Sequence, residues 1–275
     1  MDTDFLPALL TIRAGKASDF RELLEGAPSL ATRRSSSSHP TLLQALVLDG
    51  KPHPAEVQVE MARELMKRGA LLDEPLIAAA SVDNVVLAEL LIDEGAGFAG
   101  SAELLDGWSP LEEALYWGST AVRDLLLERG ADASNLRTAA GLGRRDLLTS
   151  LLEGDPESWG ILNSPWGASA PEGEVRQALL DNALSYAALE NQLEAAHQLL
   201  DAGARPDALA PGFDYRGSAL HWAAIRGHSK LCELLLLRGA DPSLRDLKIE
   251  KTAAEWASHG GHHELAERLE SDSSI

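Results

Sequence analysis

The stretch Gly217–Pro242 constrains the fold of this chain more than any other. It opens with Ser218, continues through a short alanine-rich run to a glycine turn at Gly227, and ends a leucine-rich run with Gly-Ala-Asp at 239–241. This pattern predicts two short helices packed back to back, the second of them closed by a glycine. Neither helix could bury its apolar face alone, so the pair needs copies of itself on either side.

Copies of this helix pair recur along the whole chain. The opening segment 218–223 has clear counterparts at 109–114 and 252–257. Including weaker copies, the repeats start near residues 6, 40, 74, 109, 134, 182, 218 and 252. Most intervals are 34 to 36 residues, and the two irregular ones, 25 and 48, together equal two periods. We therefore expect residues 1–275 to form a single array of about eight repeats, with the end repeats acting as caps.

The ends of the repeats are also alike. A Gly-Ala pair follows a leucine-rich or acidic helix end at 69–70, 95–96, 130–131, 203–204 and 239–240. Glycine just after a helix favours a left-handed backbone cap, which here releases the chain into a turn.

Together these segments resemble the Thr-Pro-Leu-His-x-Ala, Gly-His and Gly-Ala-Asp signatures of the ankyrin repeat family, over roughly residues 5 to 270. The connections at 24–30 and 246–248 are more similar to those of bacterial ankyrin repeat proteins than to those of regular animal arrays. The resemblance implies an all-α ankyrin-repeat solenoid of about eight helix-turn-helix units.

An irregular long loop is expected at about 155–174, because this segment contains three prolines together with Trp159 and Trp166. A loop of this length in a compact array tends to be functional or disordered. Tryptophans bury large areas, so we expect both rings to pack onto neighbouring repeats. The alternative is that one of them folds back and covers the binding groove.

Charge and cysteine content limit the function classes. The chain carries 43 acidic and 24 basic residues, a formal charge of −19, which repels nucleic acid. The N-terminus is acidic where a signal peptide is basic, and no apolar run approaches the ~20 residues of a membrane span. The one cysteine, Cys232, falls on an apolar helix face and predicts a buried reduced thiol. We expect a cytoplasmic monomer without membrane or nucleic-acid contacts.

No motif indicates catalysis, a metal or a cofactor. The histidines of 259–264 lack the His-Glu-x-x-His spacing of a zinc protease, and 97–101 lacks the lysine of a phosphate-binding loop. By resemblance, His262 belongs to a structural turn, and His221 hydrogen-bonds the polar residue that opens its repeat. We therefore expect a non-enzymatic protein with no metal ligands.

Binding residues are expected, by resemblance, on the concave inner-helix face and at the turn tips. The inner-helix positions precede the glycine turn of each repeat. Aromatic residues and arginine, which are enriched in interface hot spots, occupy several of these positions. The candidates are Trp108, Tyr116, Trp117, Leu189, Tyr215, Arg216, Ile225, Arg226 and His259. The predicted function is a non-enzymatic module that binds a protein or peptide whose identity is unknown.

Two other hypotheses stay open. One is a small-ligand receptor or enzyme with a pocket between the concave face and the 155–174 loop, with His221 and Tyr215 as polar groups. The other is an array that assembles with a basic partner through its acidic surface, in a salt-sensitive way.

Overall fold

The computed structural model describes residues 4–36, 40–99, 108–165, 169–171 and 173–272. These residues fall into two compact parts, the first ending at Asp132 and the second beginning at Ala133. The described residues contain sixteen α-helices and two short 3₁₀ helices, and their only β-structure is one isolated bridge between Arg245 and Thr252. The predicted all-α repeat fold is confirmed. That one unbroken array joins the two parts stays a prediction.

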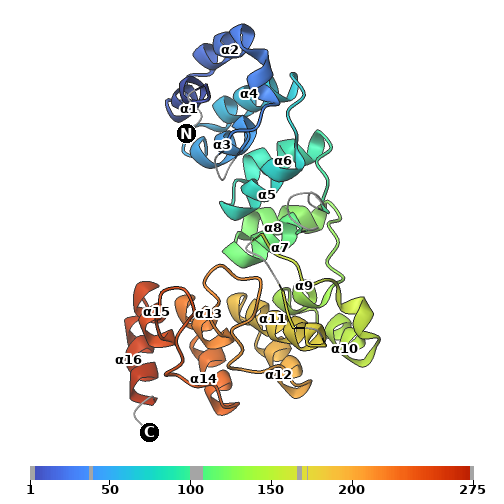
Figure 1. The fold of residues 1–275 in the computed structure, drawn as a ribbon, viewed down its shortest axis with the longest axis vertical. Helices are drawn as coiled ribbons and strands as arrows, with labels where there is room; N and C mark the ends of the chain where they lie inside the picture. The colour runs from blue at the N-terminus through green and yellow to red at the C-terminus, as the bar shows by residue number, and fades with distance from the viewer. Residues whose placement is uncertain (1–3, 37–39, 100–107, 166–168, 172, 273–275) are drawn as a thin grey trace. The chain divides into compact units, whose positions relative to one another are not determined.

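The first part consists of helix pairs that follow one another along the chain (Figure 1). Its helices are α1 (Leu6–Arg13), α2 (Ala17–Gly26), η1 (Pro28–Ala31), α3 (Leu42–Asp49), α4 (Ala55–Met66), α5 (Asp73–Ser81), α6 (Val85–Asp93), α7 (Pro110–Trp117) and α8 (Thr120–Glu128). The first helices α1, α3, α5 and α7 pack in sequence against one another, and so do the second helices α2, α4, α6 and α8. Two layers of helices result, as expected for stacked repeats.

The second part repeats this arrangement (Figure 1). Its helices are α9 (Leu136–Gly141), α10 (Arg145–Glu153), η2 (Pro156–Trp159), α11 (Val175–Leu189), α12 (Leu193–Asp201), α13 (Ala219–Ile225), α14 (Ser229–Leu237), α15 (Ala253–His259) and α16 (His263–Asp272). The first helices α9, α11, α13 and α15 form one layer, and α10, α12 and α14 form the other. The last helix, α16, packs against α15.

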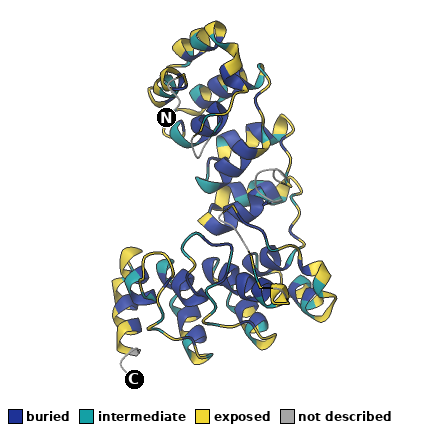
Figure 2. Cartoon of the chain, viewed as in Figure 1, coloured by how far each residue is buried: buried dark blue, intermediate teal, exposed yellow. Residues whose placement is uncertain are grey.

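The two layers differ in burial (Figure 2). In α7 every residue from Pro110 to Tyr116 is buried, whereas in α8 only Val122 and Leu126 are. A first helix is covered by its neighbours on both sides and by its own second helix, so small and apolar residues fill it. A second helix buries one stripe and leaves its charged face to solvent.

Side-chain caps fix where the first helices begin. Thr41, Ser109 and Thr252 each cap a helix and exchange hydrogen bonds with the residue three positions later, which is Gln44, Glu112 or Glu255. Such a capping box satisfies two backbone N–H groups that the helix leaves open. These residues lie where the sequence predicted the repeats to open.

His221 takes the same place in α13. Its Nδ1 lies 3.2 Å from the backbone nitrogen of Ser218 and 2.8 Å from the Ser218 hydroxyl, while its Nε2 donates to the carbonyl of Lys251 at 3.0 Å. Burial lowers the pKa of His221, which favours the neutral ring that these contacts require. The predicted structural role of this histidine is confirmed.

Neighbouring repeats are joined through the turn between the two helices of each pair. His53 Nε2 lies 2.9 Å from the carbonyl oxygen of Ile12, and His228 Nε2 lies 3.1 Å from that of Leu189. In α5–α6 an asparagine does the same, as Asn84 donates to the carbonyl of Val47 at 3.0 Å. Each bond reaches the end of the first helix in the preceding repeat, so it fixes the distance between repeats.

One helix begins earlier than predicted. The sixth repeat was expected to start near Asn182, but its first helix, α11, begins at Val175. Every residue from Ala178 to Leu189 is buried, because the added turns pack between α9 and α13. The Asp181 carboxylate, 2% exposed, accepts hydrogen bonds from the guanidinium and the backbone nitrogen of Arg205, which offsets the cost of burying it.

Trp159 is buried, but it packs on α10 of its own repeat as well as against Arg176 of the neighbouring repeat, whereas the sequence predicted packing on neighbouring repeats. Its indole N–H donates to the carbonyl of Leu151 at 2.7 Å, and the guanidinium carbon of Arg176 lies 5.0 Å from the ring centroid. Trp166, expected to pack in the same way, lies outside the described residues. Within the described residues, no helix combines the length and the apolar character needed to cross a membrane.

Candidate functional site

The nine candidate binding residues differ widely in exposure. Trp108, Tyr116 and Leu189 are buried, Tyr215, Ile225 and Arg226 are partly exposed, and Trp117, Arg216 and His259 are exposed. A partner could therefore touch six of these side chains directly. The three buried ones could act only by supporting their neighbours.

Trp117 at the end of α7 is the most exposed aromatic candidate, with 47% of its surface open. Its indole N–H donates to Glu113 Oε1 at 2.8 Å, and the indole N–H of the buried Trp108 donates to Glu113 Oε2 at 2.8 Å. The ring of Tyr116 meets that of Trp117 edge-on, with centroids 5.1 Å apart. These contacts hold Trp117 in one orientation, which lowers the entropy that a partner would lose by binding it.

Glu113 is an unusual supporting residue because its carboxylate is buried beside uncharged groups. Burial raises the pKa of Glu113 to about 7, although the two indole hydrogen bonds act in the opposite direction. Among the described residues, its hydrogen-bond partners are the two tryptophans and none is a cation. The carboxylate therefore titrates near neutral pH, and it lies at the N–H edge of an exposed aromatic ring.

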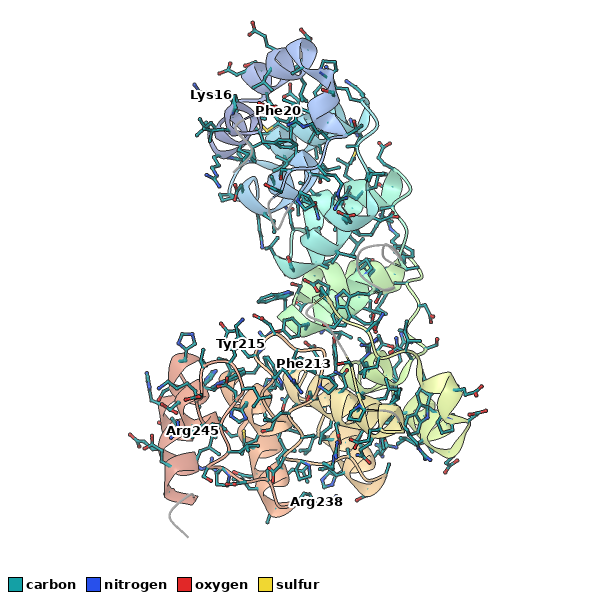
Figure 3. The ribbon with its side chains drawn as sticks, viewed as in Figure 1. Lys16, Phe20, Phe213, Tyr215, Arg238 and Arg245 are labelled. Carbon is teal, nitrogen blue, oxygen red and sulfur yellow. The ribbon has the colours of Figure 1, made fainter. Side chains whose placement is uncertain are left out.

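In the second part, Tyr215 lies on the loop that leads into α13 (Figure 3). The Lys248 ammonium lies 4.4 Å from the centroid of the Tyr215 ring and 2.6 Å from Asp214 Oδ1. The ring also meets Trp256 edge-on at 5.7 Å. These contacts join two successive turns, the one before α13, which carries Asp214 and Tyr215, and the one before α15, which carries Lys248.

Asp246 holds the turn before α15 in a fixed conformation. Its carboxylate accepts the backbone N–H groups of Lys248, Ile249 and Lys251 at 2.8 to 2.9 Å and the indole N–H of Trp256 at 3.0 Å. Burial alone would raise the pKa of Asp246, but these hydrogen bonds outweigh it and the pKa is lowered. The ionised carboxylate holds a loop that exposes two apolar side chains, Leu247 and Ile249.

The structure also brings Ile225 and His259 near each other, at the ends of the adjacent helices α13 and α15. Gly260, next to His259, approaches the Ile225 carbonyl so closely that a Cβ there would lie 2.3 Å from the oxygen. Arg216, beside Tyr215, has a positive φ of 48° and donates to the carbonyl of Leu209 at 3.3 Å.

The sequence reasoning missed Glu113 and the tip residues Leu247, Lys248 and Ile249. Glu113 went unnoticed because carboxylates are abundant in this acidic chain. Its spacing was an available signal, since Glu113 and Trp117 are four residues apart and so share one helix face.

The described residues contain no group of three or more histidine, cysteine, aspartate or glutamate side chains placed to hold a metal ion. Burial raises the pKa of Cys232 to about 12, so its thiol stays protonated. The ring nitrogens of His221 are engaged by Ser218 and by the carbonyl of Lys251.

An open cavity of about 430 Å³ lies beside α10 and α12. It is lined by Gly143, Arg144, Arg145, Asp146, Leu147, Thr149 and Gln198. None of these residues belongs to the 155–174 loop, and neither His221 nor Tyr215 is among them. The cavity is therefore separate from the pocket that the ligand-binding hypothesis expected.

The second part of the chain matches a known repeat family. The profile of the family described as "Ankyrin repeats (3 copies)" matches residues 136–246 and 184–273. These two matches overlap and together span half of the chain. They cover the helix pairs from α9 to α16.

Among individual proteins, the chain is similar to "ARF GTPase-activating protein GIT2" of Mus musculus, with 42% identity over 77 residues. It is also similar to "Palmitoyltransferase Hip14" of Drosophila melanogaster, with 33% identity over 86 residues, and to "Palmitoyltransferase ZDHHC13" of Mus musculus, with 41% identity over 75. The matched segments cover 26% to 31% of this chain but only 10% to 12% of those proteins. Each match is thus confined to a segment the length of two to three repeats. These relatives come from animals, so the predicted bacterial character is not supported by them.

Proposed function

Because this chain belongs to the ankyrin-repeat family, we propose that it is a non-enzymatic module that binds a protein or peptide on its inner-helix face and turn tips. The observation that carries this proposal is Trp117, a large aromatic side chain that is 47% exposed yet held by a hydrogen bond to Glu113. Exposed tryptophan at a fixed orientation is typical of interface hot spots.

Two features of the second part also support binding through inner-helix ends and turn tips. The ends of α13 and α15 leave Arg226 and His259 accessible, and most residues of these two helices are buried. Around Tyr215, the joined turn tips present exposed apolar side chains on a loop that Asp246 holds in place. Rigid elements that carry accessible aromatic and cationic side chains reduce the entropic cost of association.

The setting that we propose is a monomer in the cytoplasm. A single buried thiol, Cys232, is consistent with a reducing compartment. We also propose that the array is of the bacterial type. Only the sequence of the connections at 24–30 and 246–248 supports this part of the proposal.

Alanine substitutions test the proposed function. We expect Trp117→Ala and Arg226→Ala each to reduce capture of partner proteins from native extract by about ten-fold, since hot-spot truncation costs upward of ~1 kcal/mol. Lys230→Ala is the matched control, because Lys230 is an exposed cation on the second helix α14. Circular dichroism should show the same helicity in all variants. Capture that is unchanged by both substitutions would refute the proposed surface.

A further inference from the structure

We propose that Trp117 and Glu113 form a subsite for a cationic side chain, lysine or arginine, carried by a basic peptide segment of the partner. This inference rests on the proposed function, because it names the chemistry of a partner at the same surface.

Glu113 is 6% exposed, and its carboxylate has no cation among its described partners. Each of its oxygens accepts one indole N–H, so each keeps a lone pair that no described group uses. A buried carboxylate without a counter-ion is costly, and proteins normally pair such a group. Within the described residues, therefore, no cation neutralises the Glu113 carboxylate, and a bound cation could do so.

Trp117 supplies the place where a cation could approach. The indole π-system attracts a cation within about 6 Å of the ring centroid, and most strongly for tryptophan among the aromatic side chains. Because the Trp117 N–H donates to Glu113, the carboxylate makes the ring more electron-rich and adds its own negative charge. A lysine or arginine resting on the exposed part of the ring would interact with both groups.

The other charged groups on the elements packed against α7 are already engaged. On α5, Asp73 accepts the backbone N–H of Gly97 and Glu74 pairs with Arg34. On α8, Arg123 and Asp124 pair with each other.

Within α7, Glu112 completes the capping box with Ser109. Glu128 is the last residue of α8, and Arg129 follows it directly. Arg129 pairs with Glu89 and Asp93. None of these groups is among those that shift the pKa of Glu113. The titration of Glu113 is therefore set by burial and by the two indoles.

Charge favours a basic occupant over an acidic one. The chain carries a formal charge of −19, so a cationic segment is attracted over long range and an acidic one is repelled. Binding of a cation also favours the ionised form of Glu113, so complex formation should release a proton when the pH lies near the pKa of about 7. Affinity for the cation should accordingly rise between pH 6 and pH 8.

The experiment follows the indole N–H signals of the full chain by NMR. The signals of Trp108 and Trp117 are assigned from single Trp→Phe variants. Three blocked tripeptides serve as probes, identical except for a central lysine, norleucine or glutamate. We expect the lysine peptide to shift the Trp117 signal with a Kd on the order of 1 mM, and more tightly at pH 8 than at pH 6. The norleucine and glutamate peptides should leave the signal in place.

Glu113→Gln is the decisive variant, because it keeps the shape of the side chain and removes its charge. Its single amide oxygen can accept from only one of the two indoles, so the loss of pH dependence, rather than weaker binding alone, identifies the role of the charge. We expect it to weaken lysine-peptide binding about five-fold and to abolish the pH dependence. Glu112→Gln, a neighbouring change that can keep the capping box, should bind as the parent does.

The proposal is overturned if the norleucine peptide binds as well as the lysine peptide, if the glutamate peptide binds better, or if Glu113→Gln binds unchanged. Failure here is distinguishable from failure of the proposed function. Partner capture that depends on Trp117 but not on Glu113 would keep the binding module and reject the cation subsite.

Discussion

At the scale of single residues, the most consequential group is a carboxylate that the fold buries without a charged partner. Glu113 connects a buried tryptophan with an exposed one through its two oxygens. Its burial costs stability when the group is ionised. The same carboxylate holds Trp117 at the surface through a hydrogen bond. Buried Glu113 thus lowers stability when ionised and also orients the candidate binding residue.

The pKa of Glu113 predicts a pH dependence of stability. Its rise from 4.5 to about 7 means that the folded chain binds more protons than the unfolded chain between these values. The free energy of unfolding should therefore fall as the pH rises through this window, by on the order of 3 kcal/mol. Glu113→Gln should remove this fall, as urea titrations at pH 5 and pH 8 would measure.

The control is Glu112→Gln, which should keep the fall in stability between pH 5 and pH 8. A Glu113→Gln variant whose unfolding free energy depends on pH as strongly as that of the parent would show that the carboxylate titrates normally.

A glycine in a left-handed conformation gives a second residue-scale prediction. Gly227 has φ of 73°, and a Cβ there would lie 2.5 Å from the ring of His262. Gly227→Ala should cost about 1–3 kcal/mol, because strain and a steric clash combine. Gly239→Ala is the matched control, since Gly239 has φ of 90° but nothing within 4 Å of the added Cβ. Thermal denaturation of both variants should show the larger loss for Gly227, and equal losses would mean that the His262 contact is unimportant.

At the scale of helices, stability depends on residues that connect one repeat to the next. Asn84 caps α6 by accepting the backbone N–H of Leu87, and it also donates to the carbonyl of Val47 and to Gln58 Oε1 at 3.0 Å each. Its side chain is buried, so its removal would leave two acceptors without this donor.

We expect Asn84→Ala to lower the free energy of unfolding by about 2–3 kcal/mol, since a cap and two buried hydrogen bonds are lost. Ser109→Ala removes only a capping box within one helix and should cost about 1 kcal/mol. Urea unfolding followed by circular dichroism compares the two. A larger loss for Ser109→Ala would mean that connections between repeats contribute little.

Helix boundaries show what the sequence can predict. The openings of α7, α13 and α15 follow from Ser109, Ser218 and Thr252, because a capping residue has a local physical effect that does not depend on distant partners. The start of α11 could not be predicted in this way. Its residues are buried all round, so periodicity gives no signal, and its length is decided by contacts with α9 and α13.

The candidate site was predictable in part for a similar reason. Repeat register locates the inner-helix positions, and Trp117, Arg226 and His259 are accessible there. Register does not reveal that Tyr116 and Leu189, which occupy equivalent positions, are buried. Exposure depends on tertiary packing that the register does not contain. The pairing of Trp108 with Glu113 depends on a side chain that reaches across the start of α7.

At the scale of the whole molecule, charge should govern how a partner arrives. With a formal charge of −19, the chain attracts a basic partner over distances that salt screens. Raising the ionic strength from about 0.05 M to 0.5 M should slow association about ten-fold or more and change dissociation much less. Surface plasmon resonance with the captured partner would measure both rates. An association rate that is insensitive to salt would argue against a basic partner.

The central claim, that a partner binds the inner-helix face, is tested most directly by site-specific photo-crosslinking. A photoreactive residue is placed at His259 on α15 or, for comparison, at Glu264 on α16, both exposed and in the same repeat. After irradiation in native extract, the account predicts a crosslinked partner from position 259 and little from position 264. Equal or stronger crosslinking from position 264 would contradict it.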